Sequence, residues 1–405
     1  MRKLSLGLLA LFVFSIPFVD VFRAVTTTLM IATFSCTFAT CILEKRINKP
    51  PTLLYVVCAL ACWQLTSYFW SYDTSATLER ARIMLYVLAT VWVLTELCRS
   101  KRERIIVAQA FVFGCFVLFV FVAQAYFSGS FIDNYRSAPD NINPNGAGVV
   151  FSIGAALAML VIDVRPSKLG FWVSIAFIPI GFLGVILTAS RAGFILISIA
   201  SLGTFFVLKH ISLIPRITWI AILLAGITLV FFTFADNQEL SNNLDRITFQ
   251  TDTNSLRTMT HRTEIWAVAV RHFTRNPLLG DGAGAFAIAA DHELGRLWVV
   301  HNIYLESAAE TGLLGLFLLL AAFSVTGWSI LRSSGQQKGL LLILWFVIIG
   351  IGIGLSVGYR YEFWFAMTFL LLPDVDSRQE VEGDKSAKQI PLFANPSELV
   401  MDQQT

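Results

Sequence analysis

Apolar runs of bilayer length recur along this chain, and they limit the folds that are open to it. The chain has 405 residues, of which 56% are hydrophobic and 14% are charged, whereas soluble domains carry about 25% charge. A helix needs about 20 apolar residues to cross the hydrocarbon core. We therefore expect an all-α polytopic membrane protein. The runs predict about twelve spans, at 4–19, 23–43, 52–70, 81–97, 105–126, 146–163, 171–189, 192–208, 217–235, 301–330, 340–357 and 361–373.

The spans divide the chain into four parts. Residues 1–235 hold spans one to nine, 236–300 form one large outer loop, and 301–373 hold the last three spans. The tail, 374–405, lacks apolar periodicity and is expected to be disordered. The first run mimics a secretory signal, but no small-x-small cleavage site follows, so we expect it to be kept as a span.

Lysine and arginine are distributed unequally between the two sides. With the N-terminus in the cytoplasm, the basic connectors face inward, as the positive-inside rule requires, and the tail is cytoplasmic too. All nine lysines then lie inside. The outer side carries twelve arginines: Arg23, Arg80, Arg82, Arg136, Arg191, Arg246, Arg257, Arg262, Arg271, Arg275, Arg296 and Arg360. Because arginine grips carboxylate and phosphate with a planar fork, we expect an anionic group to be held there.

The outer loop contains a predicted amphipathic helix, with Thr260 as its N-cap and Pro277 after its end. Its apolar face comprises Ile265, Trp266, Ala269 and Phe273. Arg262 lies on that same face, opposite Glu264 and Arg271. A partner is therefore required, either Glu306 or Glu310 or an anionic substrate.

The glycine-rich stretch "GDGAGAF" at 280 follows this helix. It superficially resembles a nucleotide loop, but no strand precedes it, and a lone glycine-rich match is weak. We interpret it as a turn that brings the backbone close to the membrane.

His301 stands at the outer mouth of span ten, in "HNIYLESAAETGLLG". A neutral imidazole can take a proton from a hydroxyl nucleophile, which makes His301 the best candidate general base. The alternative is a histidine that only hydrogen-bonds a loop carbonyl. Glu306 and Glu310 lie deeper in the membrane along the same span, where ionisable residues are functional or paired. We expect them either to tune the proton affinity of His301 or to anchor an arginine. Gly312 and Gly315 predict a close helix contact.

Each of the remaining candidate residues has two possible interpretations. Arg191 lies at the tip of the hairpin "TASRAGF" and either binds the anion or snorkels to lipid phosphate. Arg80 and Arg82 begin span four and either bind a diphosphate or carbohydrate or serve as anchors. Cys58 and Cys62 share a helix face and are interpreted as small core residues rather than a metal pair.

Four pieces in order resemble the O-antigen ligase and polymerase superfamily: "PNGAG" at 144, "SRAG" at 190, "HRTEIW…NPLLGDGAGAF" at 261 and "HNIYLESAAETGLLG" at 301. The resemblance implies a bacterial inner-membrane glycosyltransferase of the GT-C type, acting on the periplasmic face. Ligases of this kind move O-antigen from undecaprenyl diphosphate to a sugar of lipid A–core in lipopolysaccharide biosynthesis.

The resemblance also implies roles for residues. Arg191 and Arg262 hold the diphosphate, and His301 assists the acceptor hydroxyl. Further substrate-binding candidates are Arg80, Arg82, Arg136, Arg360, Asn302, Tyr304 and Glu306.

The first outer loop carries a single carboxylate, Asp20, where many lipid-linked GT-C enzymes hold a metal. We therefore expect no metal and no other cofactor, with arginines stabilising the leaving diphosphate. Direct displacement by the hydroxyl inverts the anomeric centre.

Two groups of alternatives remain open. An O-antigen polymerase or a protein O-oligosaccharyltransferase shares the architecture, although the latter commonly carries a larger C-terminal periplasmic region. A lipid-linked glycan transporter needs charges near mid-membrane in several spans, and spans six to nine hold almost none.

Overall fold

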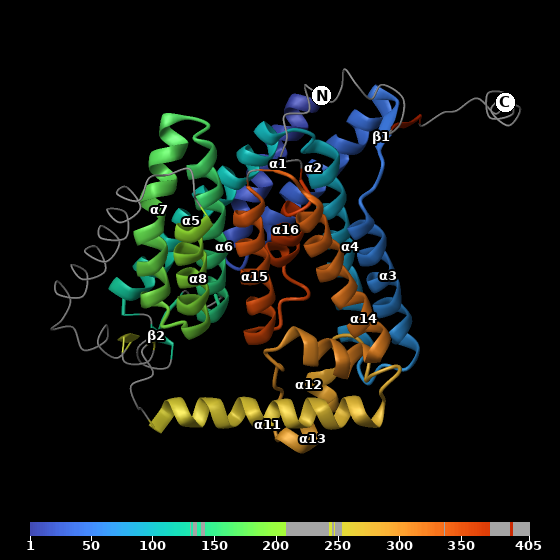
Figure 1. Ribbon diagram of the computed structural model, residues 1–405. Coiled ribbons are helices and arrows are strands. Elements are labelled where there is room, and N and C mark those ends of the chain that lie inside the picture. Colours follow the sequence, from blue (N-terminus) through green and yellow to red (C-terminus); the bar gives the residue numbers. More distant parts are fainter. Residues whose placement is uncertain are drawn as a thin grey trace, which may run out of the picture.

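The fold is an all-α bundle crossed at one end by a long surface helix (Figure 1). The computed structural model describes residues 1–129, 131–132, 136–138, 142–207, 243–244, 247, 253–335, 337–372 and 389–391. The bundle helices are α1 (Arg2–Ser15), α2 (Arg23–Glu44), α3 (Thr52–Thr66), α4 (Thr74–Leu97), α5 (Lys101–Phe127), α6 (Pro144–Val164), α7 (Lys168–Leu187), α8 (Arg191–Val207), α14 (Ile303–Arg332), α15 (Lys338–Gly354) and α16 (Tyr361–Phe369). Short 3₁₀ turns, η1 (Ile16–Phe18) and η2 (Ser67–Phe69), extend α1 and α3.

Eleven of the twelve predicted spans fall on these helices, and the ninth, 217–235, lies outside the described residues. Within the described part of the chain, six helices are long and apolar enough to cross a membrane: α2, α3 with η2, α5, α6, α7 and α14. Residues Arg191–Gly203 and Lys338–Gly354 form shorter apolar helices. An all-α polytopic membrane protein is thus confirmed, while the number of spans stays a prediction.

Helix α4 begins earlier than the predicted boundary at residue 81. Its first residue is Thr74, because the Asp73 carboxylate accepts hydrogen bonds from the backbone N–H groups of Ser75 (2.9 Å) and Ala76 (3.1 Å). Such a cap satisfies donors that the first helical turn cannot pair itself. The extra turns carry Arg80, which the site below requires.

Helix α6 is the centre of the bundle and packs against α5, α7, α8 and α15. In its most apolar stretch 89% of the residues are buried. The contact with α8 is close because it joins two glycines: a Cβ added to Gly193 would lie 2.8 Å from Gly148 Cα. Ser152 adds a hydrogen bond to the carbonyl oxygen of Gly193 at 3.0 Å. The "PNGAG" and "SRAG" segments therefore meet in space.

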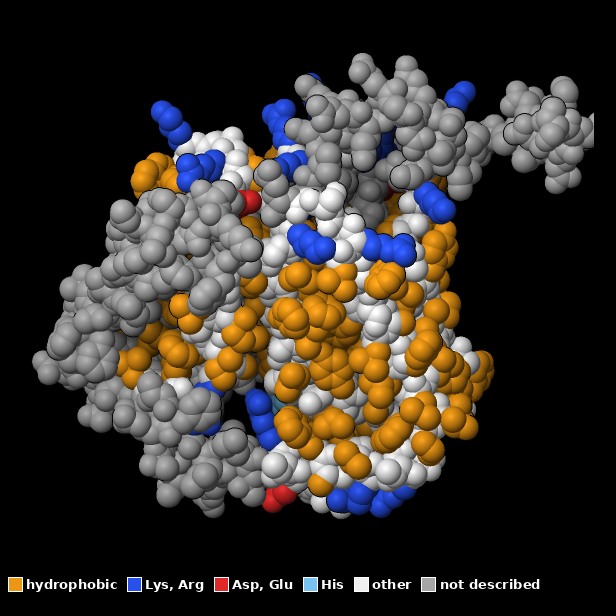
Figure 2. All heavy atoms as spheres, in the orientation of Figure 1, with side chains coloured by type: hydrophobic (Ala, Val, Ile, Leu, Met, Phe, Trp, Pro, Cys, Tyr) orange, Lys and Arg blue, Asp and Glu red, His pale blue; other side chains and the backbone are white. Residues whose placement is uncertain are grey.

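The two ends of the bundle differ in what they carry. Figure 1 shows the N-terminus at one end and α11 (Thr253–Arg275) across the other. A broad belt of apolar side chains lies between them, with lysines and arginines gathered mainly toward the ends (Figure 2). Strand β1 (Arg46–Asn48) pairs antiparallel with β4 (Gln389–Pro391). Part of the tail thus meets a connector that we predict to be cytoplasmic.

A second, smaller core joins α11 to the N-terminal end of α14. It holds Ile265, Val268 and Ala269 of α11, together with Phe286 of α12 (Phe286–Ala289) and Val300. The short helix α13 (Asp291–Leu294) follows α12. Glu264 and Arg271 are exposed, as expected.

Three details of the sequence interpretation were wrong. Helix α11 begins at Thr253 rather than after a cap at Thr260. Its buried face includes Val268, while Phe273 is only half-buried, because the face is rotated from the predicted one. Cys58 and Cys62 are exposed on α3 instead of lying in the core. An apolar exterior is favourable in lipid, so hydrophobicity alone does not identify the inner face of a membrane helix.

Candidate functional site

The glycine-rich turn after α11 is built into a break in α14. Gly312 has φ 65° and ψ −163°, a conformation that interrupts the helix and is essentially restricted to glycine. The backbone N–H groups of Asp281 and Gly282 donate to the carbonyl oxygens of Ala309 (2.9 Å) and Glu310 (2.8 Å). In return, the N–H of Leu313 donates to the Pro277 carbonyl at 2.8 Å.

These contacts show what the turn "GDGAGAF" packs against, while its approach to the membrane stays a prediction. It approaches the backbone of α14: a Cβ on Gly280 would lie 2.5 Å from the Glu310 carbonyl, and one on Gly312 would lie 2.3 Å from the Leu278 oxygen. Broken helices at membrane depth need protein partners for the freed backbone groups. The turn supplies these partners, and Trp63 of α3 adds an indole N–H to the Thr311 carbonyl at 2.9 Å.

A tryptophan adds a hydrogen bond to the apolar contacts that hold helix α11 beside the start of α14. The indole N–H of Trp266 donates to the carbonyl oxygen of Val300 at 2.9 Å. One helical turn earlier on the same face lies Arg262. The pKa of His301 is lowered to about 4 by two causes. The larger is burial of the imidazole, and the smaller is the positive charge of the nearby Arg262 guanidinium. The structure therefore brings together two of the three residues assigned to catalysis, and it keeps the imidazole neutral at physiological pH.

His301 is held in an unusual backbone conformation. Its φ is 54°, in the left-handed region that non-glycine residues seldom adopt, and its backbone N–H donates to Ser356 Oγ at 3.1 Å. Asn302 caps α14 by accepting from the N–H groups of Tyr304 (3.0 Å) and Leu305 (3.1 Å). The Tyr304 hydroxyl donates to the Ile349 carbonyl at 3.1 Å. Asn302 and Tyr304 therefore position His301, and their contact with substrate stays a prediction.

Arg191 is the first residue of α8, on the same end of the bundle. Ser190 accepts a hydrogen bond from the Gly193 N–H at 3.2 Å and fixes this start. The neighbouring Ala192 lies against the end of α15, where a Cβ on Gly354 would be 3.6 Å from Ala192 Cβ. The segment that leaves α15 there continues to Ser356, the partner of His301. Figure 2 shows a hollow near this end of the molecule with lysine or arginine side chains beside it.

Arg80 is an internal counter-ion for two glutamates of α14. It lies 3.4 Å from Glu306 and 3.8 Å from Glu310, with 15% of its side chain exposed. The guanidinium also stacks 4.1 Å above the ring of Tyr359. Glu310 reaches further and accepts the backbone N–H of Gly284 at 2.8 Å. The carboxylates considered as partners of Arg262 are thus paired with Arg80, and an anionic substrate as the partner of Arg262 stays a prediction.

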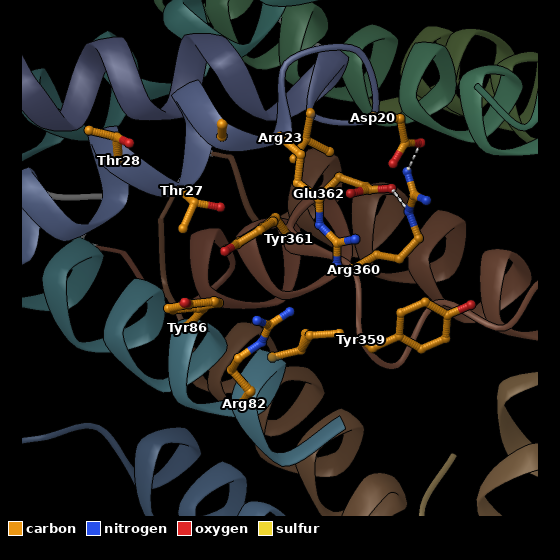
Figure 3. Close-up of a pocket in the computed structure, with 13 residues that line it drawn as sticks. Asp20, Arg23, Thr27, Thr28, Arg82, Tyr86, Tyr359, Arg360, Tyr361 and Glu362 are labelled. Carbon is orange, nitrogen blue, oxygen red and sulfur yellow. Dashed lines mark hydrogen bonds and ion pairs between the residues drawn. The ribbon is translucent and has the colours of Figure 1, made fainter. Parts of the chain in front are cut away.

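Arg360 is paired in a similar way, with Asp20 at 2.7 Å and with Glu362. It lines a cavity of about 650 Å³ between α2, α4 and the start of α16. Figure 3 shows that Arg23 and Arg82 point into this cavity from α2 and α4. Both arginines are largely exposed, at 67% and 59%, and both pair with Glu79. The sole acidic residue of the first outer loop, Asp20, is thus engaged by an arginine.

Several histidines and arginines of the loop have structural roles. His272 and Asp281 are both buried and lie 2.6 Å apart, tying α11 to the glycine-rich turn. Hydrogen bonds from Arg271 and Arg275 hold the pKa of Glu293 below its ordinary value. Arg136 belongs to β3 (Arg136–Ser137), which pairs with β2 (Phe131–Ile132), and its role stays a prediction. Among the described residues no group of three or more His, Cys, Asp or Glu is placed to hold a metal ion.

Sequence reasoning missed Ser356, Tyr359 and the partners of Arg360. The segment "LSVGYR" before the last span could have drawn notice, because its serine, tyrosine and arginine stand between two apolar runs. Its glycine also marks a close approach, since a Cβ on Gly358 would lie 3.2 Å from Ile303. This segment contacts His301 through Ser356 and Arg80 through Tyr359, and it ends at Arg360.

The comparison with known proteins covers the part of the chain that holds most of this site. A family model described as O-antigen ligase matches residues 174–320. No curated protein matches the chain. The matched residues include Arg191, Arg262 and His301 together with the kinked half of α14. The match supports a function of the O-antigen ligase or polymerase type in lipopolysaccharide-related glycan assembly, with lipid-linked glycan and lipid A–core as the partners that this family implies in general. Residues 174–320 are thus similar to the O-antigen ligase family, as the sequence resemblance implied.

Proposed function

We propose that the chain is an O-antigen ligase that moves a glycan from undecaprenyl diphosphate to a sugar hydroxyl of lipid A–core on the periplasmic side of the inner membrane. The observation that carries the proposal is the placement of a neutral imidazole, His301, beside the Arg262 guanidinium. A base and a fixed positive charge are the two groups that this reaction needs at one point. The family match supplies the reaction class, and the geometry supports the roles of the residues.

In the proposed reaction, the acceptor hydroxyl oxygen attacks the anomeric carbon of the glycan while the bond to the diphosphate oxygen breaks. The proton of the hydroxyl passes to the free ring nitrogen of His301, and the electron pair of the broken bond leaves with undecaprenyl diphosphate. Arg191 and Arg262 stabilise the charge on this leaving group. One displacement inverts the anomeric centre. No step calls for a metal or another cofactor.

Substrate binding would also prepare the base. Without substrate, the Arg262 charge helps to hold the pKa of His301 near 4, which makes the imidazole neutral but weakly basic. A bound diphosphate neutralises Arg262 and adds negative charge close to the ring, and both changes favour the imidazolium. The base thus becomes stronger when the donor is in place.

The other candidates divide into two groups. Arg82, together with Arg23, faces a cavity and can meet a substrate directly. Arg80 and Glu306 form an ion pair with each other, and Asn302 caps α14. For these three we favour a positioning role, in which they hold the start of α14 and therefore His301.

The test is transfer with purified components: undecaprenyl-diphosphate glycan, lipid A–core, and the protein in detergent. Compared with wild type, His301→Ala, Arg191→Ala and Arg262→Ala should each lower transfer by about 10²-fold or more, the range for a lost general base or charge-stabilising donor. Arg271→Ala, which removes an exposed partner of Glu293 on the same helix, is the matched control. Transfer should survive EDTA.

Each other outcome has a definite meaning. Growth of the glycan chain without transfer to lipid A–core would identify a polymerase. Loss of transfer in EDTA, restored by a divalent cation, would disprove the metal-free mechanism. Full activity in the His301 and Arg191 variants would remove these residues from the site.

A further inference from the structure

A second cavity, of about 540 Å³, lies next to the polar cavity of Figure 3. Helices α2, α3 and α4 line it with apolar side chains, among them Phe34, Cys58, Ala89 and Trp92. Tyr86 lines both cavities. They are therefore adjacent parts of one feature, which we call the α2–α4 cleft.

The cleft changes from polar to apolar along the helices. On α2 the polar cavity is lined by positions 23–28 and the apolar cavity by 30–34. On α4 the order is the same, with Arg82 in the polar part and Ala89 and Trp92 only in the apolar part. Since α2 and α4 both run inward from the end that carries α11, the polar part lies at the outer end. The cleft thus has the polarity of an amphiphile inserted from the outer leaflet.

The polar part offers hydrogen-bond donors and acceptors in balance. Three arginines, Arg23, Arg82 and Arg360, line it with the carboxylates of Asp20 and Glu362, which pair with Arg360. Arg23 and Arg82 pair with Glu79, which is not part of the lining. The hydroxyls of Thr27, Thr28, Tyr86 and Tyr361 line the remaining wall. Sugar hydroxyls both donate and accept, and this set can satisfy them. A diphosphate would need a surplus of positive charge, and the paired carboxylates cancel that surplus.

The cleft also adjoins the surroundings of His301. Tyr359 and Arg360 line the polar part, and Ser356, three residues before Tyr359, accepts the backbone N–H of His301. Arg80 stacks on the ring of Tyr359. One segment, 356–360, thus borders both the cleft and the candidate base.

We propose that the α2–α4 cleft binds the acceptor glycolipid, with its saccharide head group in the polar part and an acyl chain between α2, α3 and α4. The lipid diphosphate of the donor is held elsewhere, by Arg191 and Arg262. This assignment rests on the proposed function and adds the place and orientation of the second substrate. It makes the two lipids approach His301 from different sides.

The test measures binding directly, separately from transfer. Lipid A–core (rough lipopolysaccharide), undecaprenyl diphosphate and phosphatidylglycerol are each titrated into the purified protein, and bound lipid is quantified by native mass spectrometry. Cys58→Trp fills the apolar part from an exposed position on α3. Its neighbour Ala59 is also exposed but does not line the cleft, so Ala59→Trp is the matched control. Ala89→Trp provides a second block from α4, and thermal unfolding confirms that each variant folds.

The proposal expects Cys58→Trp and Ala89→Trp to weaken lipid A–core binding tenfold or more, with Ala59→Trp unchanged and undecaprenyl-diphosphate binding retained. In transfer assays the same variants should raise KM for the acceptor and leave KM for the donor unaltered. Weaker binding of undecaprenyl diphosphate alone would overturn the proposal in favour of a polyprenyl site. Loss of phosphatidylglycerol alone would reduce the cleft to a bilayer-lipid contact.

Unchanged binding of all three lipids in both blocking variants would also overturn it. If lipid A–core binding falls as expected while wild type transfers no glycan to lipid A–core, the proposed function fails and the binding site stands. The two failures are therefore distinguishable.

Discussion

Trp266 of α11 and Val300, which precedes α14, are joined by a hydrogen bond: the indole N–H of the first donates to the carbonyl oxygen of the second at 2.9 Å. Val300 immediately precedes His301, and Arg262 stands one helical turn before Trp266. The hydrogen bond therefore sets the distance between the proposed base and the proposed diphosphate ligand. A single neutral hydrogen bond contributes about 0.5–1.5 kcal/mol.

Trp266→Phe should lower transfer by about two- to tenfold, the factor that corresponds to one hydrogen bond. The ring and most of its packing remain, so the fold should be kept. The measurement is the rate of glycan transfer together with the unfolding temperature. Trp172→Phe, at a 64% exposed position of α7, is the control and should be neutral. Equal rates for wild type and Trp266→Phe would show that α11 docks without this bond.

The acidic limb of the pH profile should report on His301. Its pKa is lowered to about 4, so the free protein keeps a neutral imidazole down to about that pH. Removing the Arg262 charge in Arg262→Gln removes one of the two causes, and the pKa should rise toward the ordinary value of about 6.5. The acidic limb of kcat/KM, which reflects the free enzyme, should therefore move to higher pH.

The control for this profile is Arg271→Gln, since Arg271 is exposed and pairs with Glu293. It should leave the limb in place. Arg262→Gln will be slow, but the position of the limb does not depend on the height of the profile. An unshifted limb in Arg262→Gln would mean that another group controls it.

Features that depend on residues close together in the sequence could be predicted better than contacts between distant segments. Helices follow from local hydrophobicity, and all predicted spans within the described residues coincide with helices. Arg262 was placed on the apolar face of its helix, but the local pattern did not show that its charge would act on His301. The pairing of Glu306 and Glu310 with Arg80 was not predicted, since Arg80 lies on a helix more than 200 residues away in sequence.

The parts of the site that could not be predicted are contacts between distant backbones. Gly312 was correctly marked as a position of close approach, but "close helix contact" gave neither the break in α14 nor the turn that fills it. The pairing of Asp20 with Arg360 joins opposite ends of the chain. Until the packing of the helices is known, each of these residues has many possible partners that carry the same chemical groups.

Gly312→Ala should destabilise the protein strongly. The residue has φ 65° and ψ −163°, which costs about 1–3 kcal/mol for a residue with a Cβ, and the added atom would lie 2.3 Å from the Leu278 oxygen. Both the clash and the strain act on the turn that holds α14. We expect a lower unfolding temperature and loss of transfer.

Gly7→Ala is the matched control in a helix. Gly7 lies in α1, and a Cβ there meets no atom within 4 Å. Alanine is favoured over glycine in a helix by about 0.5–1 kcal/mol, so this variant should be neutral or slightly more stable. An equal response of the two variants would contradict the broken-helix arrangement.

Arg80→Ala should separate anchoring from substrate binding. The substitution leaves Glu306 and Glu310 buried without their counter-ion, and breaking a buried pair in this way costs about 3–5 kcal/mol. Arg82→Ala, on the same helix, removes a 59% exposed side chain whose pair with Glu79 contributes about 0–1 kcal/mol. The unfolding temperature should therefore fall for Arg80→Ala and stay near wild type for Arg82→Ala.

The triple variant Arg80→Met, Glu306→Gln, Glu310→Gln makes the distinction sharper. It removes the charges together, so no carboxylate stays unpaired, and much of the lost stability should return. If Arg80 serves only as an anchor for α14, transfer should recover with stability because His301 regains its support. Recovery of the fold without any transfer would instead show that at least one of the three charged groups acts in transfer beyond anchoring.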